Sequence, residues 1–162
     1  MASNSNETGA APEQTGPMLT VNAQYIKDLS FEAPATPHIL AQMQQSPPDI
    51  NINIDVGAKN LQEGLFEVAL EIKAECKVGE TVAFIAELVY GGVFTLKIPE
   101  EHIQPVLLIE CPRLLFPFAR NILADVTRDG GFPPLMLGLV DFSSMYQNSL
   151  KERAEAQGQS TA

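Results

Sequence analysis

The side chains in this chain that could perform chemistry are few and lie far apart in the sequence. Its two histidines are His38 and His102, and its two cysteines are Cys76 and Cys111. Zinc sites in proteins combine such residues at close paired spacings, and none of these spacings is present. Two isolated cysteines also make no disulfide framework. The sequence therefore predicts no metal site and no cofactor.

Sequence motifs of catalysis are missing as well. The chain has no GxxxxGK[ST] phosphate-binding loop, and Ser143 and Ser144 lack the GxSxG setting of a nucleophilic serine. A helix-capping role suits these serines better. Asp125 and Arg128 have the i,i+3 spacing of an ion pair on a helix. We therefore expect that the protein is not an enzyme.

Composition narrows the class of protein further. With 162 residues, 45% of them hydrophobic, the chain can bury one core and form one domain. Twenty acidic residues against ten basic ones give a net charge of −10, which argues against nucleic acid as a partner. Neither a signal peptide nor an apolar run long enough to insert into a membrane is present. We expect a cytoplasmic protein.

The two ends of the chain differ from its middle. Residues 1–17 are rich in Ser, Asn, Gly, Thr and Pro, which predicts a disordered N-terminal tail. Residues 151–162 have no apolar period, which predicts a flexible C-terminal tail. The folded domain is expected between them, over residues 18–150.

The segment from Leu19 to Pro34 predicts the first strand of this domain. Its polar and apolar residues alternate, as in a half-buried antiparallel strand with one exposed acidic face. The alternation assigns Tyr25, Leu29 and Phe31 to one face and Asp28, Ser30 and Glu32 to the other.

Three more strands are predicted, at Ile52–Val56, Leu65–Cys76 and Thr81–Leu96. Tight turns between them indicate a meander of antiparallel neighbours. The Gly91-Gly92 pair inside the last strand suggests a bulge or a bend. Strand parity groups the acidic residues of the exposed face as Asp28, Glu32, Glu67, Glu71, Glu75 and Glu87. This acidic face could be read by a basic partner, or it could simply be a solvated surface.

Helical periodicity begins after Glu100. Residues 102–131 are apolar all round, so this helix must be covered on more than one side, and we expect a second subunit to supply part of the cover. Pro105, Pro112 and Pro117 should break, kink or restart it. Asp141 is expected to cap a final helix whose apolar side carries Phe142, Met145, Tyr146 and Leu150.

Two loops, Ala33–Asp49 and Gly130–Asp141, are more apolar than solvated linkers should be. Either they are buried locally in the core, or they border a groove for varied apolar ligands, for which methionine is well suited. The candidate groove residues are Ile39, Leu40, Met43, Phe132, Leu135, Met136, Leu137, Leu139 and Val140.

Four segments together carry a resemblance to a known family. YIKDLSFEAP with PHIL behind it, ETVAFIAELVYGGVF, CPRLLFPFAR and GGFPPLMLGLVDF resemble, in order and spacing, the bacterial SecB family of protein-export chaperones. The resemblance covers about residues 19–150. It implies an α+β fold with a four-stranded antiparallel sheet followed by two helices, assembled as a dimer of dimers. It also implies an ATP-independent holdase that binds unfolded secretory precursors and delivers them to the SecA motor.

The resemblance further implies roles for particular residues. The positions that match the family's SecA-binding site are Asp28, Glu32, Ile85 and Glu87 on the acidic face, where the basic, zinc-bearing C-terminal segment of SecA docks. The zinc belongs to that partner. The two apolar loops match the borders of the client grooves, although this chain lacks the tryptophan often found in the first of them, and Met43 or a neighbour should fill its place. Ala86, Leu88 and Tyr90 match positions linked to tetramer assembly.

Two alternatives remain open from the residues alone. One is a small oligomeric enzyme of the hot-dog type, whose long helix would come early in the chain rather than last. The other is an acidic adaptor that binds a SecA-like partner without holding clients. Binding of an unfolded polypeptide would separate the chaperone from both.

Overall fold

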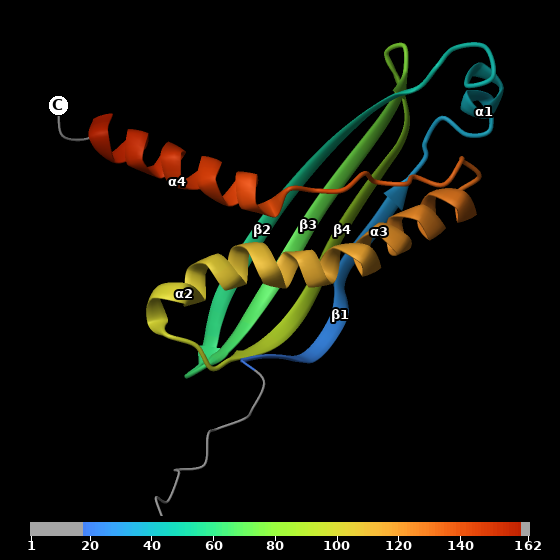
Figure 1. Ribbon diagram of the computed structural model, residues 1–162. Coiled ribbons are helices and arrows are strands. Elements are labelled where there is room, and N and C mark those ends of the chain that lie inside the picture. The colour runs from blue at the N-terminus through green and yellow to red at the C-terminus, as the bar shows by residue number, and fades with distance from the viewer. Residues whose placement is uncertain (1–17, 160–162) are drawn as a thin grey trace, which may run out of the picture.

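The computed structural model describes residues 18–159, so the predicted tail over residues 1–17 lies outside the described part. Four antiparallel strands form one sheet in the order β1-β4-β3-β2. The predicted meander is confirmed, and the first strand pairs with the last (Figure 1). The strands are β1 (Leu19–Glu32), β2 (Asp49–Gln62), β3 (Leu65–Val78) and β4 (Thr81–Leu96).

The sheet has one face covered by helices and one open face. Even-numbered residues of β3, such as Val68, Leu70 and Ile72, are almost fully buried under the helices. Odd-numbered ones, such as Glu71 and Lys73, are exposed on the open face. This is the period of two expected for a sheet with one buried and one solvent-exposed face.

The assignment of the faces in β1 needs one correction. The pairing with β4 shifts between Ile26 and Asp28, so Lys27 is an extra residue in a β-bulge. The shift reverses the parity of the strand. Tyr25, opposite Gly91, therefore shares the open face with Asp28, and not the helix-covered face with Leu29 and Phe31.

The Gly91-Gly92 pair is also not a bulge. Both residues pair in register with β1 and with β3, and the shifts in the sheet lie elsewhere. The glycines instead make room for side chains that cross the strand. A Cβ at Gly91 would lie 2.7 Å from the Tyr25 ring, and one at Gly92 would lie 2.9 Å from Leu115.

The helical run that covers the sheet consists of three joined pieces. They are α2 (Glu100–Pro105), the π-helical segment η1 (Val106–Glu110) and α3 (Cys111–Asp129). Pro105 and Pro112 flank the π-helical segment, as the predicted irregularity requires. Pro117, in contrast, lies inside α3 without ending it. It is exposed, so water can satisfy the carbonyl that lacks its usual N–H partner.

One further helix lies inside the first loop, and another follows the second loop. The short α1 (His38–Gln42) lies within the proline-containing loop after β1, where no regular structure was expected. In α4 (Phe142–Gln159) the predicted cap is confirmed, since Asp141 Oδ1 accepts a hydrogen bond of 3.1 Å from the Ser144 amide. The helix extends beyond residue 150, so most of the predicted C-terminal tail is helical. Its residues 151–159 are exposed, and their flexibility stays a prediction.

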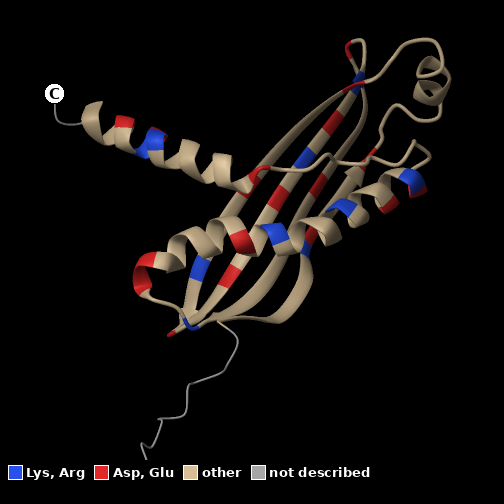
Figure 2. Cartoon of the chain, in the orientation of Figure 1, with Lys and Arg blue, Asp and Glu red and all other residues tan. Residues whose placement is uncertain are grey.

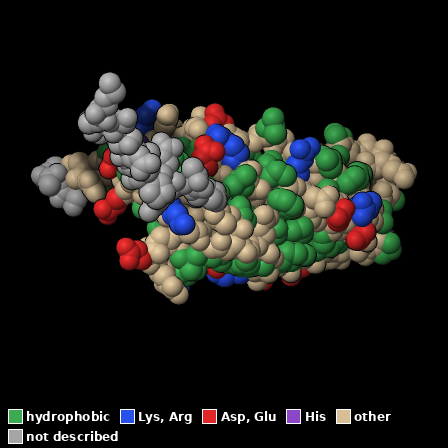
Figure 3. Space-filling model, turned by 60° about the horizontal axis from the view of Figure 1, so that its bottom comes forward, with side chains coloured by type: hydrophobic (Ala, Val, Ile, Leu, Met, Phe, Trp, Pro, Cys, Tyr) green, Lys and Arg blue, Asp and Glu red, His purple; other side chains and the backbone are tan. Residues whose placement is uncertain are grey.

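One chain covers only one side of the long helical run. α3 crosses the sheet diagonally and places Leu115, Ala119 and Leu123 in the core (Figure 1). On its outer side, Leu114 and Phe118 are 43% and 52% exposed. Figure 3 shows apolar side chains between charged ones on one surface of the molecule. Within residues 18–159, no helix is long and apolar enough to cross a membrane.

Candidate functional site

The open face brings the four predicted SecA-binding residues together at one end of β1 and β4. Asp28 lies opposite Val89, Ser30 opposite Glu87, and Glu32 opposite Ile85. Residues directly opposite one another share a face. Asp28, Glu32, Ile85 and Glu87 therefore form one continuous patch, and the bulge in β1 is what places the first two there.

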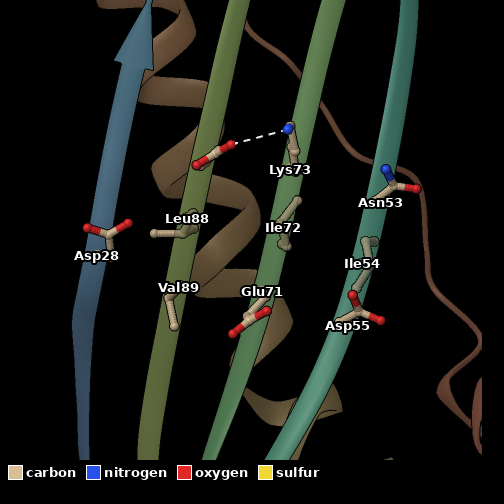
Figure 4. A pocket seen from close by; sticks show the side chains of 10 residues that line it. Asp28, Asn53, Ile54, Asp55, Glu71, Ile72, Lys73, Leu88 and Val89 are labelled. Atoms are coloured by element: carbon tan, nitrogen blue, oxygen red, sulfur yellow. Dashed lines mark ion pairs between the residues drawn. The ribbon is translucent and has the colours of Figure 1, made fainter.

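This patch continues into a shallow hollow of about 480 Å³ that spans all four strands. Figure 4 shows Asp28, Glu71 and Asp55 along its length, on β1, β3 and β2. Asp55 was missing from the sequence-based acidic group, although its alternation with Ile54 and Val56 could have placed it on this face. With Glu87 of β4, which also lines it, the hollow offers carboxylates from all four strands to one ligand.

Lysines neutralise part of the open face. Lys27 pairs with Glu67 at 2.7 Å, Lys73 with Glu87 at 3.4 Å and Lys77 with Glu75 at 3.4 Å. Figure 2 shows the acidic and basic positions along the strands. Among the described residues, no ion pair is found for the open-face acids Asp28, Glu32, Asp55 and Glu71. These four carboxylates therefore keep a negative charge that no lysine or arginine contact within residues 18–159 offsets.

A hydrogen-bonded cluster lies beside the hollow. The Tyr25 hydroxyl donates to Glu67 Oε2, and Lys27 Nζ donates to Glu67 Oε1. Burial, together with the hydrogen bond to Glu67, raises the pKa of Tyr25 to about 12. The hydrogen bonds from Lys27 and Tyr25 lower the pKa of Glu67. Tyr25 is thus a neutral donor and Glu67 a charged acceptor at neutral pH.

An apolar groove lies between the two loops that the sequence singled out. It has a volume of about 350 Å³, and its walls come from the loop after β1 and from residues 133–136. Its floor is formed by side chains of the sheet. The lining residues are Met43, Pro48, Ile50, Cys76, Phe84, Pro133, Pro134, Leu135 and Met136.

The predicted groove residues divide into four groups. Met43, Leu135 and Met136 line the groove. Six others do not: Ile39, Phe132 and Leu137 are buried in the core, Leu40 and Val140 pack against the core, and Leu139 is 93% exposed. Local burial, the alternative for these loops, therefore applies to many of their residues. The floor residues Ile50, Cys76 and Phe84 were not predicted, because their positions follow from the sheet register rather than from the loops.

The wall of the groove is held by defined contacts. Phe84 packs against Phe132 with ring centroids 5.0 Å apart, and Phe31 lies 5.6 Å from Phe84. The buried Thr127 hydroxyl accepts a hydrogen bond of 2.9 Å from the Leu135 amide. The helix α3 and the sheet therefore both position the wall.

The residues matched to tetramer assembly lie inside the subunit. Ala86, Leu88 and Tyr90 are 0%, 1% and 7% exposed on the helix-covered face of β4. None of them can touch a second subunit over any sizeable area. Tyr90 does stack on Phe118, with ring centroids 6.3 Å apart, and Phe118 reaches the surface. Through this contact, Tyr90 connects the covered face of the sheet to the outer side of α3.

The side chains that could ligate a metal ion are dispersed in the described part of the chain. No group of three or more His, Cys, Asp or Glu side chains is arranged for a metal ion within residues 18–159. Burial raises the pKa of both cysteine thiols, to about 12 for Cys111. Both thiols are therefore protonated and unreactive at neutral pH.

Comparison with known proteins identifies the family. The family model described as preprotein translocase subunit SecB matches residues 12–153. A protein-export protein SecB from Bradyrhizobium sp. strain BTAi1 is 57% identical over 155 residues, which cover 94% of this chain and 95% of that protein. Its counterpart from Paramagnetospirillum magneticum is 54% identical over 148 residues, covering 91% and 96%.

A solved structure shows the same fold at low sequence similarity. It is a SecB-like chaperone of Mycobacterium tuberculosis in complex with a ChAD peptide from the HigA1 antitoxin. It superposes with a TM-score of 0.65 at 13% identity and covers 76% of this chain and 91% of its own. Taken with the family match and the close relatives, the fold leads to one conclusion: this chain belongs to the SecB family of protein-export chaperones.

Proposed function

We propose that this protein is an ATP-independent cytoplasmic holdase that binds unfolded precursor polypeptides and delivers them to SecA. The observation that carries the proposal is the apolar groove between the two loops, which offers extended apolar segments a place to be buried. Burial of apolar surface stabilises such a complex by roughly 25 cal/mol per Å². Family membership supports the same reading, since the relatives are protein-export proteins.

The client experiment compares a groove variant with a matched control. A reduced, unfolded secretory precursor is mixed with the protein, and its refolding and co-elution are followed without ATP. Wild type should slow refolding and co-elute with the precursor. Met136→Asp puts a charge into the groove and should abolish both effects. Leu139→Asp changes a 93% exposed residue that does not line the groove and should leave both intact. Unhindered refolding with wild type would overturn the proposal.

We assign the SecA contact to Asp28, Glu32, Ile85 and Glu87. Their common place on the open face supports this assignment, because a carboxylate-rich surface suits a basic segment. Asp28→Asn and Glu32→Gln should weaken SecA binding, measured by calorimetry, while Glu63→Gln in the exposed β2–β3 turn should not. Equal affinity for all four proteins would refute the assignment.

The proposed assembly is a dimer of dimers. The exposed Leu114 and Phe118 on the outer side of α3 support a second layer of protein over that helix. The position of α3 on the sheet would be fixed by the buried side chains of Ala86, Leu88 and Tyr90. Light scattering tests this: Phe118→Glu should reduce the mass of the assembly, and an unchanged mass would exclude this surface.

Neither alternative function gains support. The helices follow the sheet in the chain order, contrary to the hot-dog arrangement. A pure adaptor would have no use for the groove. The precursor experiment decides against the chaperone if no unfolded polypeptide binds.

A further inference from the structure

The pairing of β1 with β4 shifts twice, between Val21 and Ala23 and between Ile26 and Asp28, and the acidic patch depends on the second shift. Between the first shift and this bulge, the residues of β1 on the open face have odd numbers, as Tyr25 does. After it they have even numbers, as Asp28 and Glu32 do. Without the extra residue Lys27, the side chains in the second half of the strand would exchange faces of the sheet. Asp28 and Glu32 would then face the helices, because a slip of one residue exchanges the two faces of a strand.

One carboxylate contacts both the bulged residue and a residue that precedes it. Glu67 lies on β3, two strands away from β1. Its Oε2 accepts a hydrogen bond from Tyr25, which precedes the bulge, and its Oε1 pairs with Lys27, the bulged residue. The Glu67 side chain is only 17% exposed, so water competes weakly for these contacts.

The intervening strand is adapted to this contact. The side chain of Tyr25 must cross β4 to reach β3, and it does so over Gly91, its direct partner. A Cβ at this position would lie 2.7 Å from Tyr25 Cε2, too close for the ring to stay where it is. The glycine, the tyrosine and the carboxylate therefore form one structural unit with the bulge.

We propose that Tyr25, Lys27 and Glu67, with Gly91 beneath them, are positioning residues that fix the β1 bulge and so hold Asp28 and Glu32 on the SecA-binding face. The inference rests on the proposed function for its effect on SecA, but not for its effect on the strand. Glu67 differs from Asp28 in that its charge is already offset by Lys27. Its contribution to SecA binding is indirect.

Three variants break this unit in different ways. Tyr25→Phe removes one hydrogen bond, and Glu67→Gln weakens both contacts. Gly91→Ala alters no polar group but displaces the tyrosine ring. Each should raise amide hydrogen exchange in residues 26–32 alone and weaken SecA binding about three- to tenfold, because the binding-competent register becomes less populated. Tyr146→Phe in α4 and Glu71→Gln, an open-face acid outside the unit, are controls for the exchange.

A double-mutant cycle separates positioning from direct contact. If Tyr25 acts through Glu67, the variant with both Tyr25→Phe and Glu67→Gln should bind SecA no more weakly than the weaker single variant. Additive losses without a change in exchange would mean that both residues touch SecA, and would overturn the inference. A rise in exchange over the whole sheet would also overturn it, since that is general destabilisation.

Asp28→Asn distinguishes failure of this inference from failure of the proposed function. If Asp28→Asn loses SecA affinity while the three variants keep both affinity and exchange, the bulge needs no such positioning and the inference fails alone. If Asp28→Asn keeps full affinity, the proposed SecA site fails. Local exchange in residues 26–32 then decides the positioning role by itself: a rise in the three variants supports it, and no rise refutes it.

Discussion

The open face and the apolar groove lie on opposite faces of the same sheet. At the end of β1 and β4, Glu32 and Ile85 point to the open face, while their neighbours Phe31 and Phe84 point to the groove side. The open face presents charges at positions fixed by sheet pairing. The groove presents apolar surface between two loops. The comparison suggests that a fixed polar pattern serves a defined partner, whereas an adaptable apolar surface with methionines serves many clients.

The largest expected effect comes from Phe84, which contributes to both the core and the groove floor. It is 2% exposed and packs against Phe31 and Phe132. Phe84→Ala should lower the free energy of unfolding by about 3–5 kcal/mol, because it leaves a cavity in the core. Urea denaturation measures this. A loss below about 1 kcal/mol would show that the groove floor is not part of the core.

A smaller effect separates the two regions by their response to salt. SecA binding at the open face should weaken as ionic strength rises, because the exposed carboxylates are screened within about 10 Å at 0.1 M salt. Client binding in the groove should hold or strengthen, since burial of apolar surface does not depend on charge. Calorimetry at low and high salt checks both. Parallel salt dependence would contradict separate binding regions.

The smallest effect is the pH dependence contributed by Glu67. The hydrogen bonds from Lys27 and Tyr25 lower its pKa from the ordinary value of 4.5. The unfolded chain therefore takes up the proton at a higher pH than the folded one. The stabilisation is present above pH 4.5 and is lost as the pH falls through the lowered pKa of the folded state.

Glu67→Gln isolates this contribution. The difference in unfolding free energy between wild type and the variant should be about 1 kcal/mol or less at neutral pH and should shrink in acid. A difference that is the same at pH 7 and below the lowered pKa would show that the carboxylate charge does not matter.

Alternation along the strands was sufficient to predict the sheet and most of its acidic face. It failed at Tyr25, since a bulge leaves no local signature in a sequence that alternates on both sides of it. It also failed to rank the acids, because the lysine that neutralises Glu67 comes from another strand. The groove was predicted only in outline. Apolar loop residues become core or lining according to tertiary packing, which separates Ile39 from Met43 only four positions away.

The prolines show the same limit. Pro105 and Pro112 adjoin the π-helical segment, whereas Pro117 is accommodated inside α3. Proline chemistry predicts that a hydrogen bond is lost, but exposure to water decides whether the helix ends there.

The most direct test of the account measures both ligands on both regional variants. Asp28→Asn and Met136→Asp are each titrated with SecA and with an unfolded precursor. The account predicts that Asp28→Asn loses affinity for SecA and keeps its affinity for the precursor. Met136→Asp should lose affinity for the precursor and keep its affinity for SecA. If either variant lost both ligands to the same degree with its fold intact, the two regions would not be separate sites, and the central claim would be wrong.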